Sequence, residues 1–171
     1  MATARRDSLV TRPEDSISLS LGPISARLLM RSDDSEGRVG IVESPIEAGV
    51  LASPLHIHTK EDGWWYVLEG TFAAQIGDEV VEAAPGAFVR APRGIAHTYW
   101  NPGPGRARYM EIFSPGGLER YFEQIAHLLA VVPPDIEQIL ALPAEYGLEL
   151  LWDSVEELQK QHHVLLPGLP S

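Results

Sequence analysis

Short apolar runs separated by glycine and proline constrain the fold of this chain more than any other feature. Its 171 residues include 15 Gly and 14 Pro, which together exceed the roughly 12% of an average protein. Within the runs, apolar and polar residues alternate. In residues 16–21, Ile and Leu would form one face of an extended strand and Ser the other. The pattern predicts a mainly β protein.

The alternation recurs along the first two thirds of the chain. Gly77-Asp78 separates two such runs and predicts a hairpin turn. Many short strands joined by regular turns are typical of a barrel or sandwich. The expected strands are residues 16–21, 24–30, 38–43, 64–68, 71–76, 79–83, 88–91, 97–100 and 108–113.

The pattern changes after the Ser-Pro-Gly-Gly sequence of residues 114–117. Apolar residues then recur at helical spacing over 118–129. Pro133-Pro134-Asp135 predicts the end of this helix and the start of a second through about residue 142, and a third short helix is expected over 154–161. We expect a single domain over 1–171, with N-terminal strands in 1–37, a barrel in 38–115 and a C-terminal helical segment in 116–171.

The composition excludes several function classes. The 13 basic and 24 acidic residues give a net charge of -11, which disfavours binding to nucleic acid or an anionic membrane. The chain has no cysteine, so disulfides, iron–sulfur clusters and thiol catalysis are excluded, and His, Asp and Glu remain as metal ligands. Arg5-Arg6 is not followed by an apolar region, so a cytoplasmic location is expected.

Three histidines are candidate metal ligands. His56 and His58 are two residues apart, so in a strand both side chains point to the same face. His97 follows a Pro-Arg-Gly turn at residues 92–94. A third imidazole could therefore approach the first two from a neighbouring strand.

These positions resemble the two motifs of the cupin superfamily of small β-barrels. The second motif, G-x5-P-x-G-x2-H-x3-N, is matched in full by Gly86, Pro92, Gly94, His97 and Asn101. In the first motif, G-x5-H-x-H-x3,4-E-x6-G, His56, His58 and Gly70 match, and Gly49 stands one residue too far upstream. The resemblance implies a mainly β cupin fold, a double-stranded β-helix or jelly-roll barrel, followed by helices.

The chain departs from the first motif at its glutamate. Counting back from Gly70 places the family's metal-binding Glu at position 63, which is Gly63 here. The resemblance therefore implies a metal site of His56, His58 and His97 alone. Glu61 has the parity to face inward, but it lies about 6 to 7 Å further along the strand. It remains the candidate catalytic carboxylate because it is the nearest in sequence.

The resemblance is to single-domain bacterial cupins of the quercetinase-like kind, which implies a metal-dependent dioxygenase acting on a small enol or flavonol-like substrate. Some cupin dioxygenases use three-histidine sites. The expected cofactor is a divalent metal, with Fe(II) preferred over Zn, Ni, Mn or Cu. Strand parity makes Trp65 and Tyr99 candidates for the substrate pocket. Family analogy implies a homodimer, with no nucleic-acid or membrane partner.

Two other functions remain open. Gly63 can mark a decayed metal site, which would make the protein a non-catalytic cupin that binds or senses a small molecule. A sugar isomerase or epimerase is the weaker alternative, because Lys60 and Lys160 are the only lysines and neither accompanies the site.

Overall fold

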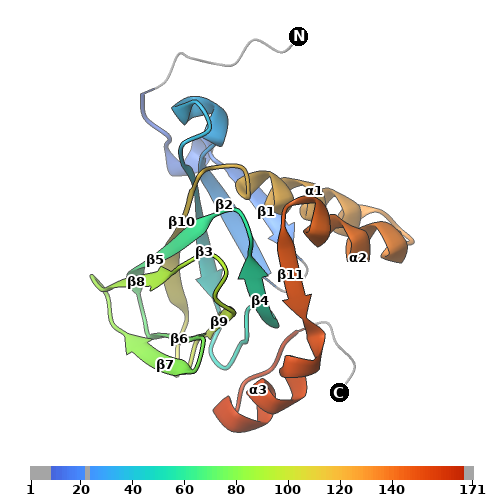
Figure 1. Ribbon diagram of the computed structural model, residues 1–171. Coiled ribbons are helices and arrows are strands. Elements are labelled where there is room, and N and C mark those ends of the chain that lie inside the picture. Colours follow the sequence, from blue (N-terminus) through green and yellow to red (C-terminus); the bar gives the residue numbers. More distant parts are fainter. Residues whose placement is uncertain (1–8, 22–23, 168–171) are drawn as a thin grey trace.

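The fold is two antiparallel β-sheets packed face to face, followed by helices, as the sequence predicts (Figure 1). The computed structural model describes residues 9–21 and 24–167, so Arg5-Arg6 lies outside the described residues. The strands are β1 (Ile17–Leu21), β2 (Ile24–Met30), β3 (Gly40–Ile46), β4 (Leu55–His58), β5 (Asp62–Glu69), β6 (Phe72–Ile76), β7 (Glu79–Ala83), β8 (Phe88–Ala91), β9 (His97–Trp100), β10 (Ala107–Ser114) and β11 (Leu148–Leu151).

The strand order places distant parts of the sequence side by side. Over the described residues, one sheet has the order β1-β2-β3-β10-β5-β8 and the other β11-β4-β9-β6-β7. Strands β7, β8 and β9 begin and end where the alternation predicts, and β6 and β7 form the expected hairpin. Gly77 has a φ of 58°, and glycine is favoured at the first position of such a two-residue loop because it adopts this conformation without strain.

The core lies between the sheets. On β5, Trp65 and Val67 are buried and alternate with partly exposed neighbours, as a strand with one inward face requires. On β10, Tyr109 and Phe113 follow the same rule. Aromatic rings therefore fill much of the barrel, including a Trp65–Tyr99 contact with ring centroids 5.2 Å apart.

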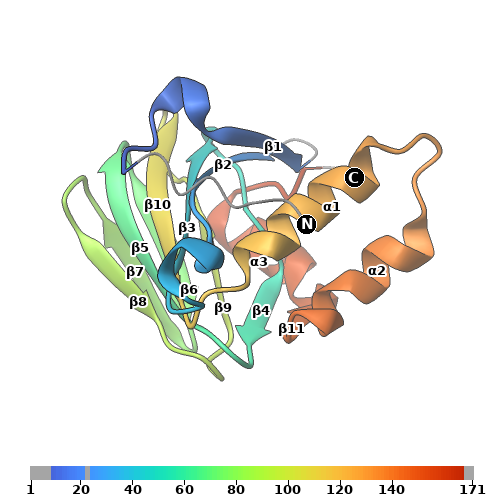
Figure 2. The ribbon, with the colours of Figure 1, turned by 90° about the horizontal axis from the view of Figure 1, so that it is seen from above.

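The helices are α1 (Glu119–Ala130), α2 (Ile136–Glu145) and α3 (Val155–His162). Figure 2 shows α1 and α2 extending to one side of the sheets. The Asp135 side chain accepts a hydrogen bond from Gln138 N at 3.1 Å and caps the start of α2. Helix α2 continues through Pro143 and ends at Glu145, three residues beyond its predicted end. No helix among the described residues is long and apolar enough to cross a membrane.

Strand β11 was not predicted, and it lies within the segment expected to be helical. It pairs with β4, with Leu148 opposite His58 and Leu150 opposite His56. The C-terminal segment therefore completes the sheet that carries all three predicted ligands, two of them on β4 and one on β9. Strand β1 lies at the far edge of the other sheet, and an edge strand can pair with a second copy. The expected homodimer stays a prediction.

Candidate metal centre

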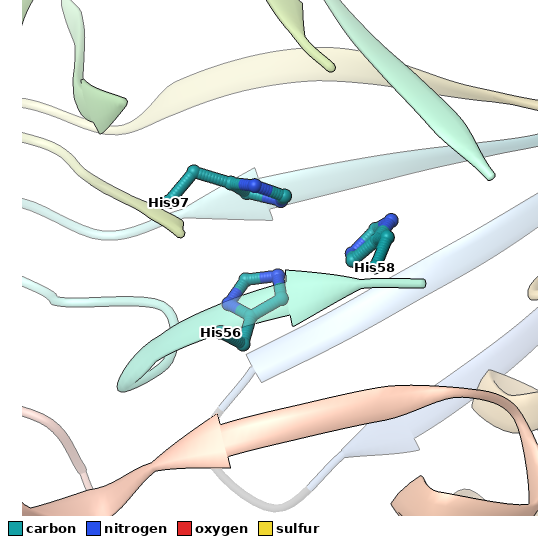
Figure 3. A group of neighbouring side chains, drawn as sticks. All are labelled: His56, His58 and His97. Atoms are coloured by element: carbon teal, nitrogen blue, oxygen red, sulfur yellow. The ribbon is translucent and has the colours of Figure 1, made fainter. Parts of the chain in front are cut away.

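The three predicted ligands come together between the sheets (Figure 3). His56 and His58 lie on β4, and His97 lies opposite His56 on β9. Their ring centroids are 4.4 to 5.0 Å apart, and one ring nitrogen from each lies within 4.8 Å of the others. All three side chains are buried. Such a cluster can hold a metal ion.

The turn before β9 positions His97. Gly94 has a φ of 76°, a left-handed conformation that favours glycine. Its N–H donates to the carbonyl oxygen of His58 at 2.8 Å, so the turn is attached to β4. The matched Asn101 is fully buried and donates to the carbonyl oxygens of Ile46 and Gly105. The second motif thus fixes the backbone around the cluster.

Hydrogen bonds leave ring nitrogens available for a metal. Nδ1 of His97 donates to the carbonyl oxygen of Ile95 at 2.8 Å, and Nδ1 of His56 donates to that of Pro54 at 3.1 Å. A carbonyl cannot donate, so each of these rings carries its proton on Nδ1 and its lone pair on Nε2. Backbone partners orient the ligands of metal sites in the same way. In the described part of the chain, His97 Nε2 and His58 Nδ1 are buried without a partner.

Burial keeps the cluster uncharged. It lowers the pKa of His56 well below the usual value, and His97 and His58 lower it further. Burial and then His97 lower the pKa of His58 to about 3, and burial also lowers that of His97. Neutral imidazole is the form that binds metal. The residues present therefore fit a divalent ion in burial, protonation state and free nitrogens.

No carboxylate belongs to this cluster among the described residues. Gly63 lies on β5, and a Cβ built there would be 4.0 Å from His58 Nδ1. Glu61 is buried, with Oε2 lacking a hydrogen-bond partner, but it lies outside the cluster. Burial raises the pKa of Glu61. The cluster is thus a three-nitrogen set, and Glu61 as the catalytic carboxylate stays a prediction.

His56 and His58 line a cavity of about 560 Å³, whereas His97 is fully buried and is not among the lining residues. Most of the polar lining comes from the barrel, and most of the apolar wall comes from β1, β2, α1, α2 and β11. Tyr99 lines this cavity, whereas Trp65 is not among the lining residues and packs in the core behind it, 5.5 Å from the His97 ring. The polar lining consists of Ser44, Ser53, His56, His58, Tyr99 and Glu111.

Glu111 is a candidate residue that the sequence reasoning missed. It lies on β10, is 4% exposed and lines the same cavity as His56 and His58. Its Oε2 has no hydrogen-bond partner within the part of the chain that the structure describes. The sequence did contain a signal for this residue. Glu111 has the same parity as Tyr109 and Phe113, which face inward, and a charged residue is unusual at an inward-facing position.

Comparisons with known proteins agree with this geometry. Residues 43–113 match the family model described as the cupin domain. A search of curated protein sequences gives no match. Among solved structures, the fold is similar to KdgF from a Halomonas species, with a TM-score of 0.58 and 19% identity, covering 66% of this chain and 98% of that one.

Two further structures show the same architecture. An RmlC-like cupin from Shewanella frigidimarina NCIMB 400 has a TM-score of 0.57 and 16% identity, covering 67% of this chain and 96% of its own. A protein described as a predicted oxalate decarboxylase from Thermotoga maritima has a TM-score of 0.56 and 16% identity, covering 62% and 98%. At these identities the likeness concerns the fold. Residues 43–113 thus match the cupin domain, and the two-sheet barrel around the histidine cluster has the cupin fold.

Proposed function

We propose that this protein is a metal-dependent oxidoreductase of the dioxygenase type that acts on a small enol or flavonol-like substrate. The observation that carries the proposal is the set of three neutral, buried imidazoles, two of which line a largely apolar cavity. His56, His58 and His97 would hold the ion. Imidazole suits Fe(II), which we favour, and also Zn, Ni, Mn and Cu.

The donor set favours an anionic oxygen ligand. With no carboxylate in the cluster, the full charge of a divalent ion is uncompensated by the protein. A metal bound there supplies Lewis acidity and a template that orients substrate and dioxygen. The apolar wall then excludes water from the reacting end of the substrate.

The cavity also suits an aromatic substrate of moderate size. Its volume of about 560 Å³ lies within the range of roughly 300 to 1,000 Å³ typical of small-molecule sites. Phe122 and Ile139 contribute to its apolar wall. A flat, apolar molecule with one chelating oxygen pair would place that pair at the histidines and its body against the helices.

Metal analysis tests the first half of the proposal. We expect near-stoichiometric metal in protein purified without chelator and its loss in His58→Ala, because two imidazoles bind far more weakly than three. His127→Ala is the matched control, since this histidine is exposed on α1 and lies outside the cluster. Absence of metal from the wild type after reconstitution would contradict the proposal.

Oxygen uptake tests the second half. Protein loaded with each candidate metal is mixed with a panel of flavonols, enols and diketones, and oxygen consumption is followed with an electrode. We expect uptake with at least one substrate class and none in His58→Ala. A metal-loaded protein that consumes no oxygen with any member of the panel would rule out the oxygenase.

The alternative is a non-catalytic cupin that binds or senses a small molecule, and the observation that favours it is Gly63. Under this alternative the cavity binds its ligand without metal. The affinity of His56→Ala and His97→Ala would then remain within about 1 kcal/mol of the wild type, less than the loss of a charged hydrogen bond. A larger loss would favour the metal-dependent function.

A further inference from the structure

We propose that Glu111 is the proton-transfer group of the histidine cavity, accepting the proton of an enol or acidic hydroxyl on the ligand. The inference rests on the proposed function, because it needs a ligand of that chemistry. It assigns to Glu111 the role for which Glu61 was the candidate from sequence.

Strand register places Glu111 on the wall that faces the cluster. Its neighbours on the inward face of β10 are Tyr109 and Phe113. The Phe113 ring centroid is 6.0 Å from that of His58, and the Tyr109 hydroxyl donates to the Tyr99 hydroxyl at 2.6 Å. Glu111 therefore lies between a residue that contacts a ligand histidine and one that contacts the cavity wall.

The adjacent strands offer Glu111 no counter-charge. Its cross-strand partners are Val42 on β3 and Trp65 on β5. Neither β3 nor β5 carries a basic residue. Arg27 on β2 and Arg108 on β10 pair with Glu43 on the opposite face of the sheet.

The titratable groups around Glu111 are tyrosines and histidines. Tyr99 and Tyr121 line the same cavity, and Tyr109 lies on the same face of β10 and is hydrogen-bonded to Tyr99. His56 and His58 line the same cavity. A buried carboxyl with a free oxygen and no cation is costly as a permanent anion, and such a group exchanges its proton instead.

The protonation equilibrium of Glu111 suits this role. Burial raises the pKa of Glu111 to about 8, and the Trp65 side chain opposes part of the shift. A group whose pKa lies near the working pH can both accept and return a proton. Glu61 is also buried, but it does not line the cavity.

The step is a simple proton transfer. The ligand O–H bond breaks, its electron pair stays on the ligand oxygen, and the proton forms an O–H bond with the Glu111 carboxylate. The resulting ligand anion is the form that a cation held by three neutral histidines binds best. Glu111 returns the proton when the ligand or product leaves, so no other reactant is needed.

The test compares the pH dependence of ligand affinity in wild type and Glu111→Gln. The probe is 3-hydroxyflavone, whose anion absorbs at longer wavelength than the neutral form, and Zn-loaded protein prevents turnover. Below the pKa of Glu111, binding of the anion releases one proton to solvent, so affinity rises tenfold per pH unit. Above it, Glu111 keeps the proton and the affinity of the wild type becomes constant.

In Glu111→Gln the released proton always goes to solvent. We expect its affinity to keep rising until the pKa of the free ligand, at least one pH unit beyond the plateau of the wild type. Gln preserves the shape and hydrogen bonding of a neutral carboxyl, so a merely structural Glu111 predicts identical profiles. Flavone, which lacks the hydroxyl, should bind both proteins with affinities within threefold of each other. Glu79→Gln, an exposed carboxylate on β7, should behave as wild type.

The outcomes separate the two proposals. A plateau that persists in Glu111→Gln, or is lost in Glu61→Gln instead, overturns the role of Glu111 and leaves the metal-dependent function intact. Zn-loaded wild type that binds 3-hydroxyflavone no better than His58→Ala overturns the proposed binding mode, and the role of Glu111 fails with it.

Discussion

Gly63 occupies the position where the first cupin motif has glutamate, and its backbone lies beside the histidine cluster. A Cβ at this position would meet Ala91 O at 3.5 Å and His58 Nδ1 at 4.0 Å, which are ordinary contact distances. The missing side chain therefore changes the charge of the cluster without being required by space at Cβ. Residue 63 is the natural place to test how charge controls the metal and its ligand.

We predict that Gly63→Glu binds divalent metal at least about tenfold more tightly than the wild type. An added carboxylate near the ion contributes more than the roughly 1.4 kcal/mol that this factor requires. The same variant should bind anionic ligands more weakly, because part of the charge of the ion is neutralised. Chelator competition measures the metal affinity. Gly63→Gln, with similar size and no charge, is the control, and an equal gain there would contradict the electrostatic reason.

A second prediction concerns Glu111 and the pH dependence of the free energy of unfolding in metal-free protein. The pKa of Glu111 is about 8 in the fold against an ordinary value of 4.5, so between these pH values the native state holds a proton that the unfolded chain has released. Stability from this residue is therefore lost as pH rises from 4.5 to 8. The free energy of unfolding of Glu111→Gln relative to wild type should increase by about 3 to 5 kcal/mol over this range.

Urea unfolding at several pH values measures this difference. The three histidines act in the opposite direction, because their lowered pKa values make the native state less stable on acidification below pH 6.5. That effect is common to both proteins and cancels in the comparison. A difference between wild type and Glu111→Gln that does not vary with pH would contradict the raised pKa.

At the scale of elements, the sequence pattern predicted strand bounds most accurately where local signals and tertiary structure agree. Strands β7, β8 and β9 alternate and end at turn residues, and their bounds are as predicted. Strand β11 has four residues and exists because it pairs with β4, about ninety residues earlier in the chain. Local pattern carries no information about such a partner. The motifs likewise indicated the three histidines, but the cavity wall depends on how the helices pack.

Helix α1 is attached to the barrel by one buried carboxylate. Glu119 is fully buried, and its two oxygens accept hydrogen bonds from the N–H groups of Ser32 and Gly117 at 2.8 Å each. A Cβ at Gly40 would lie 2.1 Å from Glu119 Oε2, so only glycine leaves room for this arrangement. The start of α1, and with it one wall of the cavity, is held by this side chain.

We predict that Glu119→Ala lowers the free energy of unfolding by about 2 to 4 kcal/mol, because one buried and one partly buried N–H group lose their acceptors. Metal content should be unchanged, since the histidines lie on other elements. Glu123→Ala is the control on the same helix, where a partly exposed ion pair with Arg31 contributes about 1 kcal/mol or less. Equal losses in the two variants, measured by urea unfolding, would contradict the anchoring role.

At the scale of the whole molecule, a bound metal would give the site a charge opposite in sign to the net charge of the chain. The chain carries -11, whereas a metal held by neutral histidines would present positive charge inside the cavity. Long-range repulsion therefore slows the approach of an anionic ligand, and short-range attraction holds it once bound.

This contrast predicts how salt affects association. The association rate of a sulfonated flavonol should rise a few-fold as the salt concentration increases from 10 to 150 mM, because the screening length falls from about 30 Å to about 8 Å. The uncharged parent flavonol should show no change. Stopped-flow fluorescence measures both rates. A rate that falls with salt would mean that the field of the site extends beyond the cavity mouth.

The cavity wall has one more consequence. The three candidate metal ligands lie within residues 43–113, whereas most of the apolar wall comes from segments that flank this region, among them Leu21, Ile139 and Leu150. Changes in the length or composition of the flanks can therefore alter which molecules are accepted without disturbing the ligands of the ion. Such a division lets related lineages diverge in substrate while inheriting the same reactive centre. It also makes exchange of the α1–α2 pair a direct route to engineered specificity.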